Sequence, residues 1–299
     1  MIENSKKEVC MSDYYRCIAV GDGIYRFTSV ENVFFELLVG EEKALLIDTG
    51  YGFGDVKGAV REITDKPLMI VNTHGHVDHT CGNYQFEEDI YISEADMDLL
   101  RRHNARTFRE KSIRLAQRVV DWESGQEVYG LPRQFDEAAY LDGGIGSHIL
   151  PLHEGMCFDL GGKHLRAFAT PGHTKGSMSL LYEEKRILYV GDAANPFLWL
   201  FDRDATDRKT LIRSLDRMAD LQPELVYGGH GPVPFSTEDL KMFRKAAVEA
   251  DYEHGIPFST PLMEECKDIR VCILNGKTMA DIGTPGFYAI LIDASRTHL

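Results

Sequence analysis

A dense group of metal-ligand side chains constrains this chain more than any other feature. Residues 73–83 read THGHVDHTCGN and place three imidazoles and one carboxylate within six consecutive positions, on His74, His76, Asp78 and His79. Imidazole nitrogens and carboxylate oxygens are common ligands of zinc and other divalent ions. The preceding segment 68–73 is apolar and predicts a buried strand, so we expect a loop at a strand end whose side chains converge on a metal site.

Further polar residues stand at the ends of other apolar segments, close to glycine or proline. They are Asp48 in LLIDTG, His173 in TPGHTKGS, Asp192 in YVGDA and His230 in GGHGP. Each alone has an ordinary interpretation as a helix cap or a turn residue. The segments ending at Asp48 and Asp192 also resemble each other, which favours a duplicated β-rich sandwich. Together these residues predict one shared site.

In this order of motifs the sequence resembles the metallo-β-lactamase-fold hydrolases, over about residues 22–235. The resemblance implies a four-layer αββα sandwich with two divalent metal ions at one edge, zinc before iron or manganese. It implies one ion on His74, His76 and His173, and a second on Asp78, His79 and His230. It also implies that Asp192 bridges the two ions, that Asp78 aligns the attacking hydroxide and that Asp48 orients a ligand by a hydrogen bond.

One residue departs from the family pattern. Cys81 stands where the family usually has a small residue, often glycine. A thiol there either approaches the second metal position or packs as a small hydrophobic side chain, and packing is the more common role of such a cysteine.

Hydrophobic periodicity outlines a single domain, 1–299. Short apolar segments predict strands at 23–29, 32–39, 43–48, 68–73, 90–93, 162–170, 177–182, 186–190 and 225–228. Amphipathic patterns predict helices at 55–63, within 94–122, at 207–221 and at 237–254. We expect 95–148 to be a helical insertion, loop-like from 124 to 146, that can act as a lid. The extension 255–299 is expected to contain strands at 270–274 and 287–293.

The implied activity is metal-dependent hydrolysis, in which a hydroxide bridging two metal ions attacks a small ester, thioester, lactone or related substrate. The acid retained at Asp192 favours these branches, because the B1 lactamases carry cysteine there. A mononuclear iron enzyme like the persulfide dioxygenases is an alternative, as is a phosphodiesterase or nuclease of the same fold. The segment 196–201, PFLWLF, predicts either an apolar substrate wall or a packing surface.

Charge and composition narrow the partners. With 33 basic and 47 acidic side chains the net charge is −14, which argues against nucleic acid and anionic membrane surfaces. No apolar stretch is long enough to span a membrane, and residues 1–10 lack the apolar core of a signal peptide. Six cysteines without CxxC spacing predict reduced thiols and a cytoplasmic location. The partner expected from the implied activity is a small-molecule substrate. The insertion and the tail are the surfaces a homodimer would use.

Overall fold

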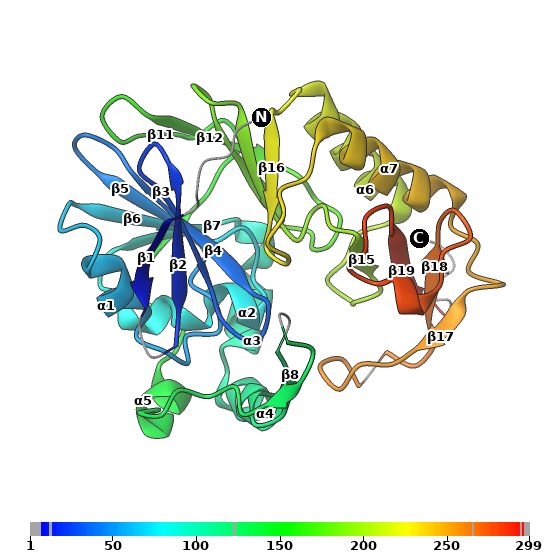
Figure 1. The fold of residues 1–299 in the computed structure, drawn as a ribbon, viewed down its shortest axis with the longest axis horizontal. Coiled ribbons are helices and arrows are strands. Elements are labelled where there is room, and N and C mark those ends of the chain that lie inside the picture. Colours follow the sequence, from blue (N-terminus) through cyan, green and yellow to red (C-terminus); the bar gives the residue numbers. More distant parts are fainter. Residues whose placement is uncertain (1–6, 12–13, 122–123, 265, 294, 296–299) are drawn as a thin grey trace. The chain divides into compact units, whose positions relative to one another are not determined.

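The chain divides into two compact units, which are described separately (Figure 1). The first unit comprises residues 1–152 and 156–165, and the second comprises 153–155 and 166–299. The computed structural model describes residues 7–11, 14–121, 124–264, 266–293 and 295. The expectations for residues 1–6, Trp122 and the last residues of the tail therefore lie outside the described residues.

The first unit is built on an eight-stranded sheet of order β1-β2-β3-β4-β5-β6-β7-β10. Its strands are β1 Lys7–Met11, β2 Arg16–Gly21, β3 Ile24–Thr28, β4 Phe34–Val39, β5 Ala44–Ile47, β6 Leu68–Val71, β7 Asp89–Ile92 and β10 His148–Pro151. Neighbours from β1 to β5 pair antiparallel, whereas β5, β6, β7 and β10 pair in parallel. The strands predicted at 23–29, 32–39, 43–48, 68–73 and 90–93 are all present.

Hydrophobic side chains hold helix α1, Val56–Arg61, on this sheet. Asp55 caps the helix, because its carboxylate accepts a hydrogen bond of 2.7 Å from the Gly58 amide. Val56 and Val60 are buried in the same cluster as core residues of the sheet. Helix α1 thereby covers the face of the sheet that carries Ala44 and Leu46 of β5.

Four helices lie between β6 and β10. They are α2 Val77–Thr80, α3 Met97–His103, α4 Arg106–Ala116 and α5 Glu137–Asp142, and 3₁₀ turns span Cys81–Gln85 and Glu94–Asp96. Helices α3 and α4 confirm the helical prediction within 94–122. Helix α4 ends at Ala116, however, and the short strand β8, Val119–Val120, follows it. Strand β8 pairs with β9, Glu127–Val128. The prediction of a loop over 124–146 was wrong at α5. Tyr140 and Leu141 of α5 are buried in a hydrophobic cluster, and this tertiary packing stabilises the helix. A helix of six residues is too short to show a periodic pattern in the sequence.

A fully buried arginine ties these helices to the histidine loop. The Arg109 guanidinium donates hydrogen bonds to backbone carbonyls of Cys81, Asn104, Tyr140 and Gly144. It also lies over the Tyr140 ring, 4.8 Å from the centroid. A buried charge is tolerated only when its donors are satisfied, so Arg109 fixes α4 and α5 against the turn that follows α2.

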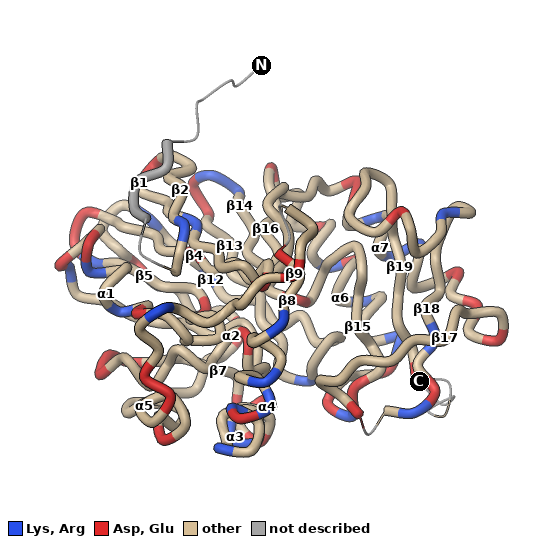
Figure 2. The backbone as a smooth tube through the Cα atoms, turned by 60° about the horizontal axis from the view of Figure 1, so that its bottom comes forward, with Lys and Arg blue, Asp and Glu red and all other residues tan. Residues whose placement is uncertain are grey.

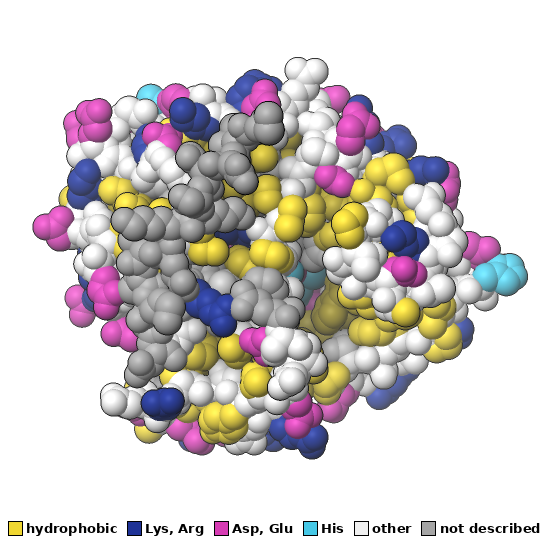
Figure 3. Space-filling view, viewed as in Figure 1, with side chains coloured by type: hydrophobic (Ala, Val, Ile, Leu, Met, Phe, Trp, Pro, Cys, Tyr) yellow, Lys and Arg dark blue, Asp and Glu magenta, His cyan; other side chains and the backbone are white. Residues whose placement is uncertain are grey.

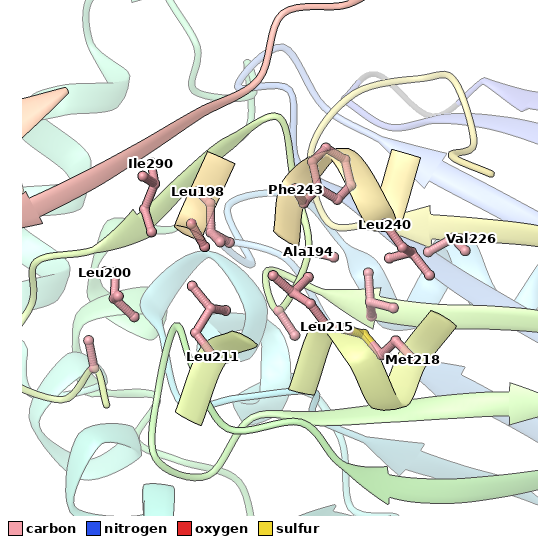
Figure 4. Close-up of a cluster of buried hydrophobic side chains, with 14 of the residues drawn as sticks. Ala194, Leu198, Leu200, Leu211, Leu215, Met218, Val226, Leu240, Phe243 and Ile290 are labelled. Atoms are coloured by element: carbon pink, nitrogen blue, oxygen red, sulfur yellow. The ribbon is translucent and has the colours of Figure 1, made fainter. Parts of the chain in front are cut away.

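The second unit contains strands and two long helices around one core (Figure 4). Its strands β13 Met178–Tyr182, β14 Ile187–Gly191 and β16 Leu225–Gly228 belong to a five-stranded sheet of order β11-β12-β13-β14-β16. Strand β11, Cys157–Asp159, is assigned to the first unit, and the unit boundary runs through β12, His164–Ala169. Helices α6, Arg208–Asp220, and α7, Thr237–Glu249, start at the side-chain caps Asp207 and Ser236. Helix α7 ends at Glu249, five residues before the predicted end at 254. The backbone of Ala250 has ψ 116°, which is outside the helical range.

The C-terminal extension forms a sheet of its own with the apolar segment after Asp192. The order is β15-β19-β18-β17, with β15 Phe197–Leu200, β17 Ile256–Phe258, β18 Ile269–Ile273 and β19 Ala289–Asp293. Strand β15 pairs in parallel with β19 across almost a hundred residues of sequence, from Phe197↔Ala289 to Leu200↔Ile292. The two predicted tail strands are confirmed, and the segment 196–201 is an edge strand of the sheet they form.

Charged residues of both signs alternate along the backbone and over the visible face (Figures 2 and 3). In the part of the chain that the structure describes, no helix is both long and apolar enough to cross a membrane.

An ion pair is buried between strands β3 and β4. Arg26 and Glu36 are cross-strand partners, and Nε of Arg26 lies 2.8 Å from Oε1 of Glu36. Both side chains are almost completely buried. Burial raises the pKa of Glu36 to about 7, and Arg26 offsets only part of that rise.

Truncation of Leu215, which is fully buried between α6 and α7, tests the core of the second unit. We expect Leu215→Ala to lower the free energy of unfolding by about 2–5 kcal/mol, because a cavity remains where the side chain packed. Urea unfolding followed by circular dichroism measures the change. The exposed Val248 of α7 supplies the control, since Val248→Ala should stay within about 0.5 kcal/mol of the parent. A Leu215→Ala value within that margin would contradict the packing.

The raised pKa of Glu36 predicts a pH dependence of stability. Between about pH 4.5 and 7 the folded protein retains a proton on Glu36 that the unfolded chain has released, so the free energy of unfolding falls as the pH rises. Glu36→Gln removes the titrating carboxyl group. The free energy of unfolding of the variant, relative to that of the parent, should therefore rise as the pH increases through that window. Urea unfolding of chelator-treated proteins at pH 5 and pH 7.5 measures it, and parallel pH profiles would refute the prediction.

Candidate metal centre

Two parallel strands bring the first set of predicted residues to one edge of the large sheet. Strand β5 ends at Ile47 and β6 ends at Val71, and these two residues are register partners. Asp48 directly follows β5, while Thr73 and His74 follow β6. Because carboxyl ends of parallel strands share an edge, residues far apart in sequence become neighbours there.

Asp48 is the buried acceptor at this edge. Its Oδ1 accepts a hydrogen bond of 2.7 Å from the Thr73 amide, and its Oδ2 accepts one of 2.8 Å from the Thr73 hydroxyl. The same Oδ2 lies 2.8 Å from Nδ1 of His79. The backbone of Asp48 has φ 64°, in the left-handed region. Asp48 therefore orients its neighbours through hydrogen bonds.

These bonds fix the tautomers of two histidines. A carboxylate only accepts, so Nδ1 of His79 carries the proton and its Nε2 is directed towards Asp78, 3.6 Å from that carboxylate. The Thr73 hydroxyl gives its proton to Asp48 and therefore accepts from Nδ1 of His74, 3.1 Å away. Both His74 and His79 thus keep the lone pair on Nε2, as metal-binding histidines require.

His74 and His76 form a closely spaced donor pair. Nε2 of His74 lies 3.0 Å from Nδ1 of His76, which stands at the start of α2. Since zinc–nitrogen bonds are about 2.0–2.1 Å long, two nitrogens at this separation fit ligands of one ion. Both imidazoles are buried.

A buried polar network behind the loop was missed from the sequence. The Asn83 amide donates to Oδ1 of Asn72 at 2.8 Å, and the Thr49 hydroxyl donates to Oδ1 of Asn83 at 2.9 Å and reaches the His79 carbonyl at 3.2 Å. Asp96 accepts a hydrogen bond from the Gly75 amide at 2.9 Å. Asn72 and Asn83 flank the histidine motif, but only the fold reveals their pairing with Thr49.

Two glycines allow the loop to lie close to its supports. A Cβ at Gly82 would stand 2.4 Å from the carbonyl oxygen of Thr49, and one at Gly75 would stand 2.9 Å from the amide of Leu100. Both distances are shorter than a carbon contact permits. Glycine at these positions is a requirement of the close backbone packing around the histidines.

Cys81 packs as a small hydrophobic side chain. It is fully buried in a cluster with Phe53, Val77 and Tyr140. Its Sγ lies 3.9 Å from the carbonyl oxygen of His103, and burial raises the pKa of the thiol. Of the two roles considered for this residue, the structure favours packing.

His103 of α3 supports the loop from its outer side. Its ring stacks on Phe108 at 3.9 Å and on His76 at 4.9 Å, with interplanar angles of 21° and 26°. His103 lies in the predicted insertion 95–148 but is not among the predicted site residues. The stacking gives it one, because it restricts the rotation of the His76 ring.

The second unit repeats the arrangement of the first. Asp192 follows β14 and His230 lies just beyond β16, and these parallel strands are in register at Gly191↔Gly228. Oδ2 of Asp192 lies 3.2 Å from Nε2 of His230 and 3.7 Å from Nε2 of His173. One carboxylate oxygen therefore faces two imidazoles, which is a donor set that fits a divalent metal ion.

His173 is held by strand β15. Its Nδ1 lies 2.9 Å from the carbonyl oxygen of Trp199, which can only accept, so Nδ1 is the donor. This leaves Nε2 of His173 to face Asp192. In each unit the predicted residues are thus brought together, and the chemistry of the donors fits divalent metal ions. The assignment of individual ligands to two ions stays a prediction.

The sequence matches the model of the metallo-β-lactamase superfamily over residues 32–230. The acyl-coenzyme A thioesterase MBLAC2 of Homo sapiens is 28% identical over 200 residues, which cover 60% of this chain and 66% of the human protein. The match thus spans just under two thirds of that relative's length.

An archaeal relative and its structure agree. The metallo-β-lactamase fold-containing protein ST1585 of Sulfurisphaera tokodaii is 26% identical over 246 residues, 78% of this chain and 86% of that protein. The crystal structure of ST1585 from Sulfolobus tokodaii superposes with a TM-score of 0.53 at 20% identity, covering 80% of this chain and 90% of that one. The predicted αββα fold class is confirmed, and the chain belongs to the metallo-β-lactamase superfamily.

Proposed function

We propose that the protein is a metal-dependent hydrolase of carboxylic thioesters and esters. It uses two divalent metal ions, and zinc is the metal that we expect. The observation that carries this proposal is the Asp192 carboxylate, whose Oδ2 faces both His173 and His230. A carboxylate oxygen that faces two imidazoles fits a ligand of a divalent ion, and the family resemblance gives this acid the position between two ions. The fixed Nε2 lone pairs of His74 and His79 support the same interpretation.

Each predicted ligand has a role in this proposal. His74, His76 and His173 would hold one ion, and Asp78, His79 and His230 the other, with Asp192 between them. When bound, such ions lower the pKa of water and polarise a substrate carbonyl. Asp78 is half-buried and Asp48 is buried, so Asp78 is the carboxylate placed to meet a reacting group while Asp48 holds His79.

A thioester substrate is favoured over the other substrates of the fold by the named relative MBLAC2, an acyl-coenzyme A thioesterase. The net charge of −14 favours a small molecule over nucleic acid. A cytoplasmic location and a homodimer remain predictions from the sequence.

The number and identity of the metal ions test the proposal directly. We expect purified protein to contain two equivalents of zinc, and acetyl thioester hydrolysis to stop with a chelator and to return with zinc. Asp192→Ala should reduce the metal content to one equivalent or less and kcat/KM at least about 100-fold. Elemental analysis and a thiol-release assay measure both. His254→Ala, an exposed histidine with an acid partner, is the control.

Two outcomes would overturn this proposal. A single iron per chain with oxygen consumption on a persulfide would establish the alternative oxygen-dependent chemistry. Protein that binds neither zinc, iron nor manganese would exclude a metal-dependent reaction.

A change at Asp48 tests its hold on His79. Asp48→Asn puts an amide where two donors need an acceptor, so His79 should lose its tautomer and the zinc affinity should fall about 10–100-fold. Competition with a chromophoric chelator measures the affinity. Asp251→Asn is the matched control, because Asp251 binds Nδ1 of exposed His254 at the same 2.8 Å. Equal zinc affinities of the two variants would show that Asp48 has no such role.

A further inference from the structure

Strand β15 has two unlike faces. Leu198 and Leu200 are buried in the core with α6 and α7. The alternate residues Phe197 and Trp199 lie on the other face and are only half-buried. Since side chains of a strand alternate between its faces, the aromatic pair is presented as a unit.

The two aromatic residues belong to a larger aromatic cluster. We define it as Phe197, Trp199, Phe201, Phe258 and Phe287. The ring centroids are 4.9 Å apart for Trp199 and Phe201, 5.7 Å for Phe197 and Phe258, and 6.4 Å for Trp199 and Phe258. Phe201 and Phe287 are buried and form its base, while the other three rings reach solvent.

This cluster adjoins a predicted metal ligand. The carbonyl of Trp199 accepts the hydrogen bond from His173 described above, so the residue that carries the indole also fixes the imidazole. Segment 196–201 contains no charged side chain. An apolar group is therefore the ligand that this face can desolvate without leaving a charge unpaired.

Part of the cluster lies outside the region shared with the family. The family model matches residues 32–230, whereas Phe258 and Phe287 come from the tail. The tail sheet brings these rings to β15 through the pairing of β15 with β19. The cluster thus combines residues of the matched region with residues of the tail, and peripheral segments such as this tail are where specificity can differ between relatives.

We propose that the aromatic cluster binds the apolar acyl chain of the substrate, while the carbonyl of the substrate lies beside the predicted ligand His173. This inference rests on the proposed hydrolase function and names its substrate class, an acyl thioester or ester with an apolar chain. Phe197, Trp199 and Phe258 determine specificity and take no part in the chemical step.

Acyl-chain length is the variable to test. N-acetylcysteamine thioesters from acetyl to dodecanoyl are the probes, and we expect kcat/KM to rise about fourfold per methylene up to the length that the cluster holds. A profile that is flat or falls from acetyl onwards would overturn the inference while leaving the hydrolase proposal standing. Failure to hydrolyse any thioester in the zinc-loaded enzyme would count against the hydrolase proposal alone.

Substitutions separate the cluster from the chemical step. Trp199→Ala and Phe258→Ala should each lower kcat/KM for octanoyl thioester at least about tenfold and for acetyl thioester less than about threefold. Trp199→Leu keeps an apolar core residue and should fold if the alanine variant does not. Val248→Ala, an exposed apolar residue of α7, should leave the chain-length profile unchanged. Equal losses on both substrates would refute the inference.

Direct binding gives a readout that needs no turnover. The chain has two tryptophans, so Trp122→Phe leaves Trp199 as the only one. In metal-free protein, octanoate should shift the Trp199 emission to shorter wavelength in a saturable way, and acetate should not. No response of the emission to octanoate would overturn the inference. A second copy of the chain covering the cluster would also overturn it. That outcome would be detected as a dimer that Phe258→Ala dissociates without a change in chain-length preference.

Discussion

The hydrogen bonds of Asp48 determine how the histidine loop can function. This buried carboxylate receives the Thr73 amide, the Thr73 hydroxyl and Nδ1 of His79. Because it accepts from all three, the proton positions on His79 and, through Thr73, on His74 follow from its charge. The left-handed backbone at Asp48 and the close approach of Gly82 to Thr49 are local costs of bringing these groups together. Arg109 and the core around β5 stabilise the result.

The two units solve the same problem in the same way. In each, two neighbouring parallel strands end beside each other, one followed by an acid and the other by a histidine. Parallel pairing fixes which ends meet, and the strands are too deeply buried to slip in register without exposing apolar side chains. The acids nevertheless differ in partners. Asp48 is occupied by donors of the backbone and side chains, whereas Oδ2 of Asp192 faces two imidazoles. The place of an acid at a strand end therefore does not determine its role, which depends on the groups that surround its carboxylate.

Features carried by short stretches of sequence could be predicted, and features produced by distant pairing could not. The strand before His74 and the helix capped by Asp207 are written in local periodicity and capping, and both are present. The pairing of β15 with β19, the network of Asn72, Asn83 and Thr49, and the stacking of His103 on His76 all depend on tertiary contacts. Helix α5 is short, and the burial of Tyr140 stabilises it. This burial depends on contacts outside the helix, so the local sequence does not predict it.

The same distinction separates chemistry from specificity. The residues predicted to hold metal lie within 32–230, the region that matches the superfamily, and they follow strands whose register the core fixes. The aromatic cluster joins that region to a tail beyond it, through β15, whose outer edge would otherwise leave the Trp199 carbonyl open to pairing with another chain. His173 satisfies that carbonyl, so one hydrogen bond both closes a sheet edge and orients a ligand. Under the proposals above, a change in the tail would alter which acyl chain is bound, while the strand ends that carry the predicted metal ligands would stay fixed.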